Sequence, residues 1–151
     1  MIQETVFVRP LDLSIETEQE ALYDLRWRVL REPLGLARGT ERIAADFDSG
    51  AVHIGAFDAE SRLVGCASLI PAESGLQLRA MAVDPMRQGA GIGAAILTSA
   101  AEVAREHGVS LWCEARAHAV GFYERSGWVI ESDLFDVPRI GPHYRMRLPS
   151  S

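Results

Sequence analysis

The sequence predicts a single α/β (α+β) domain, a mixed and mostly antiparallel sheet of about six to seven strands flanked by about four helices. Its 151 residues suit one domain with its own core. Strand and helix patterns alternate along the chain, without an internal repeat or low-complexity tract. At the centre, residues 76–104 join a strand, a glycine-rich loop and a long alanine-rich helix. We expect residues 1–151 to fold as one unit around that segment.

The first third is predicted to hold one strand and two helices. Residues 5–9 alternate as a short strand that Pro10 ends, because proline removes a ladder donor. Residues 14–31 have spaced apolar positions with acidic residues early and arginines late, as in an amphipathic helix. A loop at 32–39 contains proline and glycine, and residues 40–46 favour a second, short helix.

Three consecutive antiparallel strands are expected at residues 51–57, 63–70 and 76–83, because the turns between them have hairpin chemistry. After the glycine loop, a helical pattern runs to Gly108, where glycine can adopt the left-handed cap conformation. Residues 109–115 form a further strand, parallel to the preceding one because a helix crosses between them.

The last part of the chain is predicted to contain a short helix at residues 117–125, ended by Gly127. Residues 128–135 and 144–148 favour two closing strands. We expect that the final strand, exposed and apolar, could pair with a second subunit to form a homodimer.

Composition narrows the class of protein. Hydrophobic residues make up 48% of the chain and charged residues 24%, as in an ordinary soluble globular protein. No apolar run spans a membrane and no signal peptide pattern begins the sequence, so we expect a cytoplasmic protein. Cys66 and Cys113 stand alone, without metal spacing, which favours buried thiols and no metal. The formal net charge of −6 disfavours nucleic-acid or anionic-membrane partners.

The glycine loop, residues 87–93 (RQGAGIG), is typical of a phosphate-binding site. The first N–H groups of a helix have no partner within it, and the helix dipole favours anions there. Gly89, Gly91 and Gly93 permit positive φ and a close approach of phosphate to the main chain. The alternative is that these glycines only form a strand-to-helix turn.

The loop also matches the dinucleotide fingerprint G-x-G-x-x-A, from Gly89 to Ala94, with Glu114 about 20 residues later in the place of a ribose-binding acid. The context differs, because the segment DPMRQ separates the strand from the glycines and most of the chain lies upstream. Too few residues follow Glu114 for a doubly wound sheet. A dinucleotide-binding domain therefore stays the less favoured interpretation.

Two motifs carry a more specific resemblance. Residues 88–93 (QGAGIG) resemble the Q/R-x-x-G-x-G/A signature of the GNAT superfamily of N-acetyltransferases, and the preceding MAVDP resembles its V-x-P approach. Residues 119–128 (AVGFYERSGW) resemble its A-x-x-F-Y-E-x-x-G-F/W segment. The resemblance covers roughly residues 50–130 and implies a GNAT-like acyltransferase domain. Such an enzyme transfers an acetyl group from acetyl-CoA, its acyl-donor cosubstrate, to a primary amine by direct attack in a ternary complex.

The resemblance also implies where the donor binds. Its pyrophosphate would lie on the glycine-loop amides. Its pantetheine arm would pair with the main chain near Met81 to Val83, where a backbone N–H would polarise the carbonyl. The expected donor-binding residues are Met81, Ala82, Val83, Gln88, Gly89, Ala90, Gly91, Ile92, Gly93 and Ala94.

Two residues are candidates for proton transfer. Tyr123 stands at the F-Y position, where by resemblance a tyrosine protonates the departing thiolate; the alternative is a half-buried aromatic residue. Glu114 ends a central strand beside the expected cleft and is the candidate base for the amine; the alternative is an ion pair with Arg116. His143, entering the last strand, is a further candidate to face the acceptor.

One position departs from the superfamily pattern. Asparagine often stands three residues before the alanine of A-x-x-F-Y, where it helps to hold the donor, and here the residue is Arg116. An acyl group other than acetyl therefore stays open. So does the acceptor, a small-molecule or peptide amine. A CoA-binding sensor without catalysis is the alternative from another class, although the presence of Tyr123 and a complete glycine loop favours the enzyme.

Overall fold

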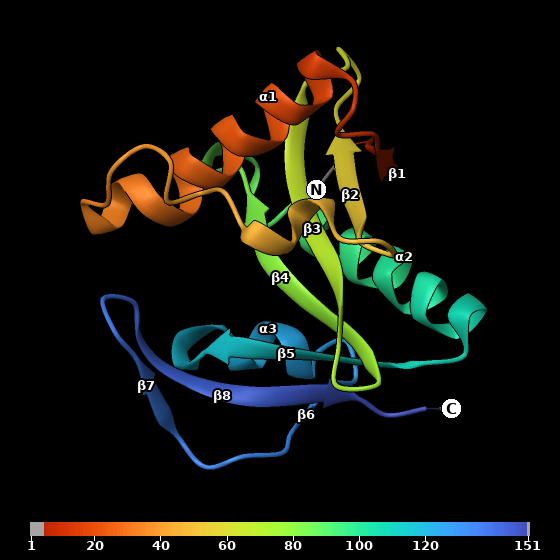
Figure 1. The fold of residues 1–151 in the computed structure, drawn as a ribbon, viewed down its shortest axis with the longest axis vertical. Helices are drawn as coiled ribbons and strands as arrows, with labels where there is room; N and C mark the ends of the chain where they lie inside the picture. The colour runs from red at the N-terminus through yellow and green to blue at the C-terminus, as the bar shows by residue number, and fades with distance from the viewer. Residues whose placement is uncertain (1–4, 151) are drawn as a thin grey trace.

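One eight-stranded sheet forms the centre of the computed structural model, which describes residues 5–150 (Figure 1). The strands are β1 (Phe7–Leu11), β2 (Val52–Phe57), β3 (Leu63–Ala72), β4 (Gly75–Val83), β5 (Ser110–Arg116), β6 (Val129–Ile130), β7 (Phe135–Val137) and β8 (Gly141–Leu148). The α-helices are α1 (Glu16–Arg26), α2 (Ile92–His107) and α3 (Val120–Glu124). A π-helical turn, η1 (Trp27–Arg31), continues α1, and 3-10 turns lie at η2 (Glu32–Leu34), η3 (Ala44–Phe47), η4 (Pro85–Arg87) and η5 (Ala117–Ala119).

The predicted α/β (α+β) fold with a mixed, mostly antiparallel sheet is confirmed. The strand order is β1-β2-β3-β4-β5-β8-β6, with β7 paired to β8. Within residues 5–150, β4 and β5 are the one parallel pair, and α2 crosses between them as expected. A sheet with one parallel pair is not doubly wound, so the fold rules out the dinucleotide-binding interpretation.

Element counts differ from those predicted in two places. Residues 128–135 form the two short strands β6 and β7 instead of one, because the Ser132 hydroxyl accepts the Arg145 N–H at 2.8 Å and replaces the ladder bond. Residues 40–46 contain most of the short 3-10 turn η3 (Ala44–Phe47) instead of a second α-helix. Pro10 does not end its strand: β1 lies at the sheet edge, where a missing N–H is tolerated.

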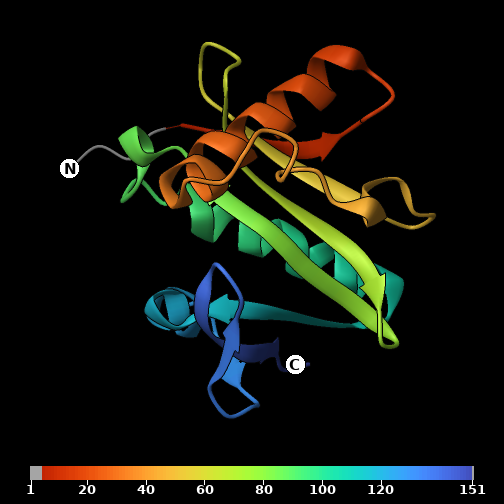
Figure 2. The same ribbon diagram turned by 60° about the vertical axis from the view of Figure 1, so that its left-hand side comes forward.

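Helices α1 and α2 cover opposite faces of the sheet (Figure 2). Leu22 and Leu25 of α1 pack with Cys66 and Ala82 on one face. On the other face, the fully buried Ile92, Ile96 and Ala100 of α2 follow helical spacing and pack into the larger core, which contains Leu69 and Leu78 of the sheet. The two helices therefore enclose β3 and β4 between them.

The final strand β8 is not an edge of the sheet. It pairs with β5 along one side and with β6 and β7 along the other. We expected an exposed final strand that could pair with a second subunit. The premise is wrong, because β8 already has a partner strand on each side. The edge at this end is the two-residue strand β6, whose Val129 and Ile130 are exposed. No helix in the described part of the chain has the length and apolarity needed to cross a membrane.

Candidate active site

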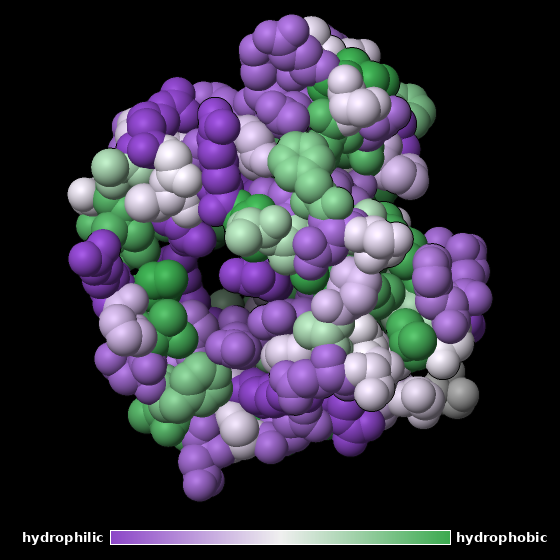
Figure 3. Space-filling model, viewed as in Figure 1, coloured by the Kyte–Doolittle hydropathy of each residue, from purple (hydrophilic) through white to green (hydrophobic). Residues whose placement is uncertain are grey.

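A pocket opens where β4 and β5 separate. The two strands pair only from Gly75–Leu78 with residues 110–113, and beyond these pairs they diverge (Figure 2). The cavity between them has a volume of about 860 Å³. The face in Figure 3 is hollowed to the left of its middle, and both hydrophilic and hydrophobic residues surround the hollow. Because β5 no longer pairs with β4 here, the β4 main chain is free to pair with an extended ligand.

A β-bulge shapes the β4 side of this pocket. Cys66 and Ser68 of β3 lie opposite Ala82 and Arg79 of β4, so two residues of β4 face one of β3. Ala80, in the bulge, has φ of +53°, a left-handed conformation that alanine rarely adopts. The strained bulge turns the main chain at residues 80–83 toward the pocket, where Met81, Ala82 and Val83 were predicted to hold the donor.

The glycine loop lies at one end of the same pocket and leads into α2. Gly89 and Gly91 have φ of +87° and +84°, which confirms the predicted left-handed conformation at these two glycines. Gly91 is the N-terminal cap of α2, and no side chain caps that end of the helix. The first N–H groups of α2 therefore remain available to an anion, as the loop pattern predicts.

Gly93 has a different role from the predicted one. It lies within α2 and is not among the described residues with positive φ. A Cβ added at Gly93 would lie 2.8 Å from Cζ of Phe122 and 2.9 Å from its Cε1. The glycine is therefore needed for close packing of α2 against α3, and it contributes no flexible backbone to the loop.

The loop is anchored at its start by an ion pair. Arg87 donates from Nη2 to Oδ2 of Asp58 at 2.9 Å, and Asp58 is almost fully buried in the β2–β3 turn. The Arg62 N–H, together with Arg87 and Arg62 guanidinium groups, lowers the pKa of Asp58 to about 2. Gln88 adds a bond from its side-chain amide to the Val83 carbonyl at 3.3 Å. The loop is thereby held before any ligand arrives.

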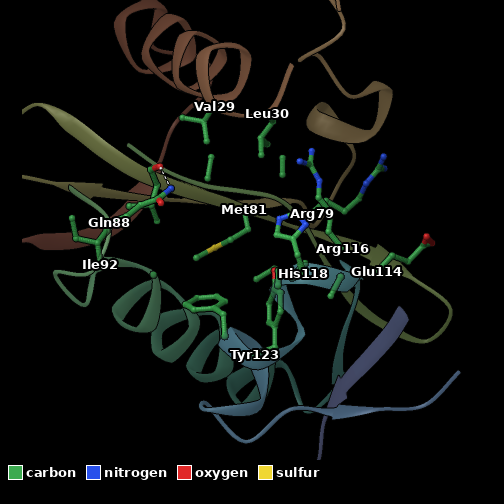
Figure 4. Close-up of a pocket in the computed structure, with 18 of the residues that line it drawn as sticks. Val29, Leu30, Arg79, Met81, Gln88, Ile92, Glu114, Arg116, His118 and Tyr123 are labelled. Carbon is green, nitrogen blue, oxygen red and sulfur yellow. Dashed lines mark hydrogen bonds between the residues drawn. The ribbon is translucent and has the colours of Figure 1, made fainter. Parts of the chain in front are cut away.

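Tyr123 lies in the pocket wall opposite β4 (Figure 4). Its ring packs edge to face on Phe122 and Trp128, with centroids 5.1 Å and 5.3 Å away. Burial, then the neighbouring Cys113, raises its pKa above the usual 10, so the hydroxyl stays protonated at neutral pH. It hydrogen-bonds the Cys113 thiol, whose own pKa burial raises to about 12. A neutral thiol is a weak hydrogen-bond acceptor, so the Tyr123 hydroxyl can turn its hydrogen bond to a stronger acceptor in the pocket.

Glu114 and two histidines also line the pocket. In Figure 4, His118 lies beside Tyr123, whereas the Glu114 carboxylate points away from it. The alternative that Glu114 pairs with Arg116 finds no support, since no such ion pair occurs in residues 5–150. His143 is buried, stacks on Phe135 and bonds the Gly141 carbonyl through Nδ1 at 2.7 Å. His143 therefore lines the pocket while its ring is held by these contacts.

Sequence reasoning missed that arginines gather in the pocket. Its lining includes Arg31, Arg79, Arg87, Arg116 and Arg125 against a single carboxylate, Glu114, within the described residues. The chain as a whole has a formal charge of −6, so this concentration of positive charge is local. Spacing in the sequence carries no sign of it, because the arginines come from separate segments.

A second polar cluster is buried away from the pocket. Arg26 forms a bidentate ion pair with Asp46 at 2.8 and 2.9 Å and donates to the Ser68 hydroxyl at 2.7 Å. His53 lies 2.7 Å from the same hydroxyl, and its other ring nitrogen bonds the Asp46 main-chain carbonyl. Ser68 is fully buried and the carboxylate faces Arg26 instead of the histidine. The cluster is therefore structural, not a nucleophilic triad.

Among residues 5–150, no three His, Cys, Asp or Glu side chains gather as they would to hold a metal ion. Cys66 and Cys113 are both free and buried. Burial raises the pKa of the Cys66 thiol to about 12, so neither cysteine is a ready nucleophile.

Comparison with known proteins gives consistent matches. The model of the acetyltransferase (GNAT) family matches residues 19–128. An uncharacterized N-acetyltransferase of Bacillus subtilis (strain 168), YitI, is 30% identical over 135 residues, which are 84% of this chain and 89% of that protein.

Solved structures agree on the fold. The crystal structure of Escherichia coli ElaA matches with a TM-score of 0.84 at 18% identity, over 96% of this chain and 100% of that one. An aminoglycoside 6'-N-acetyltransferase complexed with coenzyme A matches with a TM-score of 0.76 at 18% identity, over 96% and 98% of the two chains.

Proposed function

Because the chain belongs to the acetyltransferase (GNAT) family and is an acyltransferase, we propose that it transfers an acetyl group from acetyl-CoA to a primary amine. The observation that carries this proposal is the single pocket into which three features open: the uncapped start of α2, the β4 bulge and Tyr123. These features suit three groups of a thioester donor, in this order: its diphosphate, its carbonyl and its sulfur. A solved relative is described as a complex with coenzyme A, which supports the choice of donor.

The donor lies along β4 in this proposal. Its pyrophosphate accepts bonds from the main-chain N–H groups between Gln88 and Ala94, where the helix dipole favours negative charge. Its pantetheine arm runs alongside the main chain of Met81 to Val83 on the side that faces the pocket, as an added strand would. A backbone N–H beside the bulge donates to the thioester oxygen and stabilises the negative charge that develops there.

The reaction is a direct displacement. The amine lone pair attacks the thioester carbon, a C–N bond forms, and the C–S bond then breaks, leaving the electron pair on sulfur. The amine loses one proton and the thiolate gains one, so an amide and free CoA are the only products. Tyr123 donates toward the departing sulfur, exchanging the weak Cys113 acceptor for a thiolate. Because burial raises the pKa of Tyr123, its phenolate is strongly basic and takes up a proton again before the next turnover.

Glu114 is the candidate to receive the proton of the amine. It lines the pocket at the end of β5 and has no ion-pair partner in the described chain. Its carboxylate points away from Tyr123, so the proton travels through water or after a side-chain rotation. The two buried free cysteines are consistent with work in a reducing cytoplasm.

Calorimetry with two matched glycine variants tests donor binding. Gly91 and Gly108 both adopt left-handed φ, at the start and the end of α2. Glutamate at either position imposes similar backbone strain and adds the same charge, but only Gly91→Glu places that charge at the diphosphate. We expect Gly91→Glu to weaken acetyl-CoA binding by about tenfold or more, while Gly108→Glu binds as the wild type does. Equal affinity of the two variants would refute the loop assignment.

Release of free thiol in the presence of an amine panel tests catalysis. A non-catalytic sensor would bind acetyl-CoA in calorimetry and yet release no CoA above the uncatalysed background. An enzyme of the proposed kind releases one CoA for each amide formed.

A further inference from the structure

The end of the pocket remote from the glycine loop is lined by three arginines. Arg31 ends the π-helical turn η1, Arg79 precedes the β4 bulge, and Arg116 ends β5. In Figure 4, Arg79 and Arg116 lie at the opposite end of the pocket from Gln88 and Ile92. Val83 lies four positions beyond Arg79 along β4, which spans at most about 13 Å at 3.3 Å per residue. The three residues Arg31, Arg79 and Arg116 are called the arginine end below.

These side chains lack anionic partners within residues 5–150. The side chains of Arg79 and Arg116 form no hydrogen bond or ion pair there. Arg31 donates only to main-chain carbonyls, from Nε to Thr40 at 3.2 Å and from Nη1 to Leu30 at 3.3 Å.

Three carboxylates of neighbouring segments form no ion pair with these arginines within the described residues. Glu41 accepts the Gly39 N–H at 2.7 Å and lies 3.6 Å from Arg42, while Asp46 is held by the buried Arg26. Glu114 lies two residues before Arg116 on the same side of β5, and its carboxylate forms no ion pair with that arginine within the described chain. Glu41 attracts Arg31 through space but forms no ion pair with it, so the arginine end keeps a net positive charge within the described residues.

Electrostatics shows that the three groups affect one another. Burial, followed by repulsion from Arg116, Arg26 and Arg79, lowers the pKa of Arg31. Burial likewise lowers the pKa of Arg116, and the Arg116 charge reaches the Tyr123 hydroxyl. Guanidinium groups remain protonated at neutral pH even so. Partly desolvated like charges are costly to hold together, and a bound anion removes that cost.

We propose that the arginine end binds an anionic group of the acceptor, so that the acceptor is a small amine that also carries a carboxylate or a phosphate. This inference rests on the proposed acetyl transfer and names the substrate class of the same site. With its anion on Arg79 and Arg116, such a molecule directs its amine toward Tyr123 and the bulge, where the thioester lies. The planar guanidinium fork suits either anion, since both accept bidentate bonds.

The principal competing role for these arginines is to bind the 3'-phosphate of CoA. The donor's diphosphate belongs at the glycine loop, so its nucleotide extends from that end of the pocket and its thioester points toward Tyr123. The arginine end lies beyond the thioester, on the acceptor side. Arg87, which is hydrogen-bonded to Asp58 beside the loop, lies nearer to the donor phosphates.

Matched amine pairs test the substrate class. Each amino acid is compared with its own amide, and phosphoethanolamine with ethanolamine, in the thiol-release assay. We expect kcat/KM for the best anionic amine to exceed that of its neutral partner by about thirtyfold or more. The carboxylate and phosphate arms distinguish the two anions. Equal rates for the anionic and neutral members of every pair would overturn the inference and leave acetyl transfer intact.

Arginine variants test the residues. Arg79→Gln and Arg116→Gln should each raise KM for the anionic acceptor about tenfold, with acetyl-CoA affinity unchanged within about twofold. Arg116→Lys should recover part of the loss because it restores the charge without the planar fork. Arg105→Gln, on the exposed surface of α2, is the matched control and should change neither constant. Variants that weaken CoA but not dephospho-CoA would assign the arginine end to the 3'-phosphate and overturn the inference.

A binding measurement keeps this test independent of turnover. Inorganic phosphate and β-alanine are titrated into the CoA-bound protein while the arginine Nε–H resonances are followed by NMR. Saturable shifts that disappear in Arg79→Gln and Arg116→Gln support the anion site even if no amine releases thiol, a result that would sink only the proposed catalysis. Absence of any saturable shift in the wild type would overturn the anion site itself.

Discussion

Replacing Arg26 by methionine should destabilise the fold severely. The side chain is 1% exposed and makes four hydrogen bonds: two to Asp46, one to the Ser68 hydroxyl and one to the Glu41 carbonyl. Burial alone would raise the pKa of Asp46, but Arg26 holds it below its usual value, so the carboxylate is charged in the folded state. Methionine fills a similar volume and removes the compensating charge.

The size of the loss in stability depends on the hydrogen bonds that the Asp46 carboxylate would keep. Without Arg26, Asp46 keeps the Ile43 N–H at 2.9 Å and a long contact to the Tyr23 hydroxyl at 3.4 Å. Removing one partner of a buried ion pair costs about 3–5 kcal/mol. For a domain of this size, that loss lowers the melting temperature by roughly 6–20 °C.

The chain provides a matched control two residues further on, in the π-helical turn η1 that continues α1. Arg28 forms an ion pair with Asp24 at 2.9 Å, but both side chains are more than 40% exposed. Such a surface pair contributes only about 0.5 kcal/mol. Differential scanning calorimetry should therefore show a large loss for Arg26→Met and almost none for Arg28→Met. If the two variants melt within about 2 °C of each other, the reasoning about the buried pair is wrong.

Three further outcomes are expected. Tyr123→Phe should lower kcat by about 10²-fold or more while acetyl-CoA affinity changes little, because only the proton donor is lost; unchanged turnover would remove Tyr123 from the mechanism. Gly93→Ala should lower the free energy of unfolding by up to about 2 kcal/mol and reduce kcat, because the new Cβ displaces the Phe122 ring that packs on Tyr123. Adding Phe122→Leu should restore the lost stability. A double variant that melts no higher than Gly93→Ala would count against this steric cause. Burial lowers the pKa of His53 below its usual 6.5, so the unfolded chain binds a proton that the folded chain does not, and the free energy of unfolding should fall as pH drops below about 6.5. Denaturant titrations at pH 5.5 and 7.5 check this, and a His53→Gln variant with the same pH slope as the wild type would contradict it.

The glycine loop shows how far local signals reach. Positive φ at Gly89 and Gly91 was predictable because a strand-to-helix turn requires it within a few residues, and glycine meets the requirement at little cost. The role of Gly93 was not predictable, because the Phe122 ring, which occupies the space where a Cβ of residue 93 would lie, is 29 positions further along the chain. Likewise, nothing about alanine at position 80 indicates that a bulge would fall there.

The sequence by itself determined most of the strands and helices in their order, the end of α2 at Gly108, and the motifs that indicate a GNAT acetyltransferase. Periodicity, capping and turn chemistry act between neighbouring residues, so they are legible in the chain. Only the tertiary structure brought Arg31, Arg79 and Arg116 to one end of a pocket, and Arg26 to Asp46, His53 and Ser68. These groups come from distant segments, and the separation of β4 from β5 and the packing of α1 on the sheet decide which of them meet.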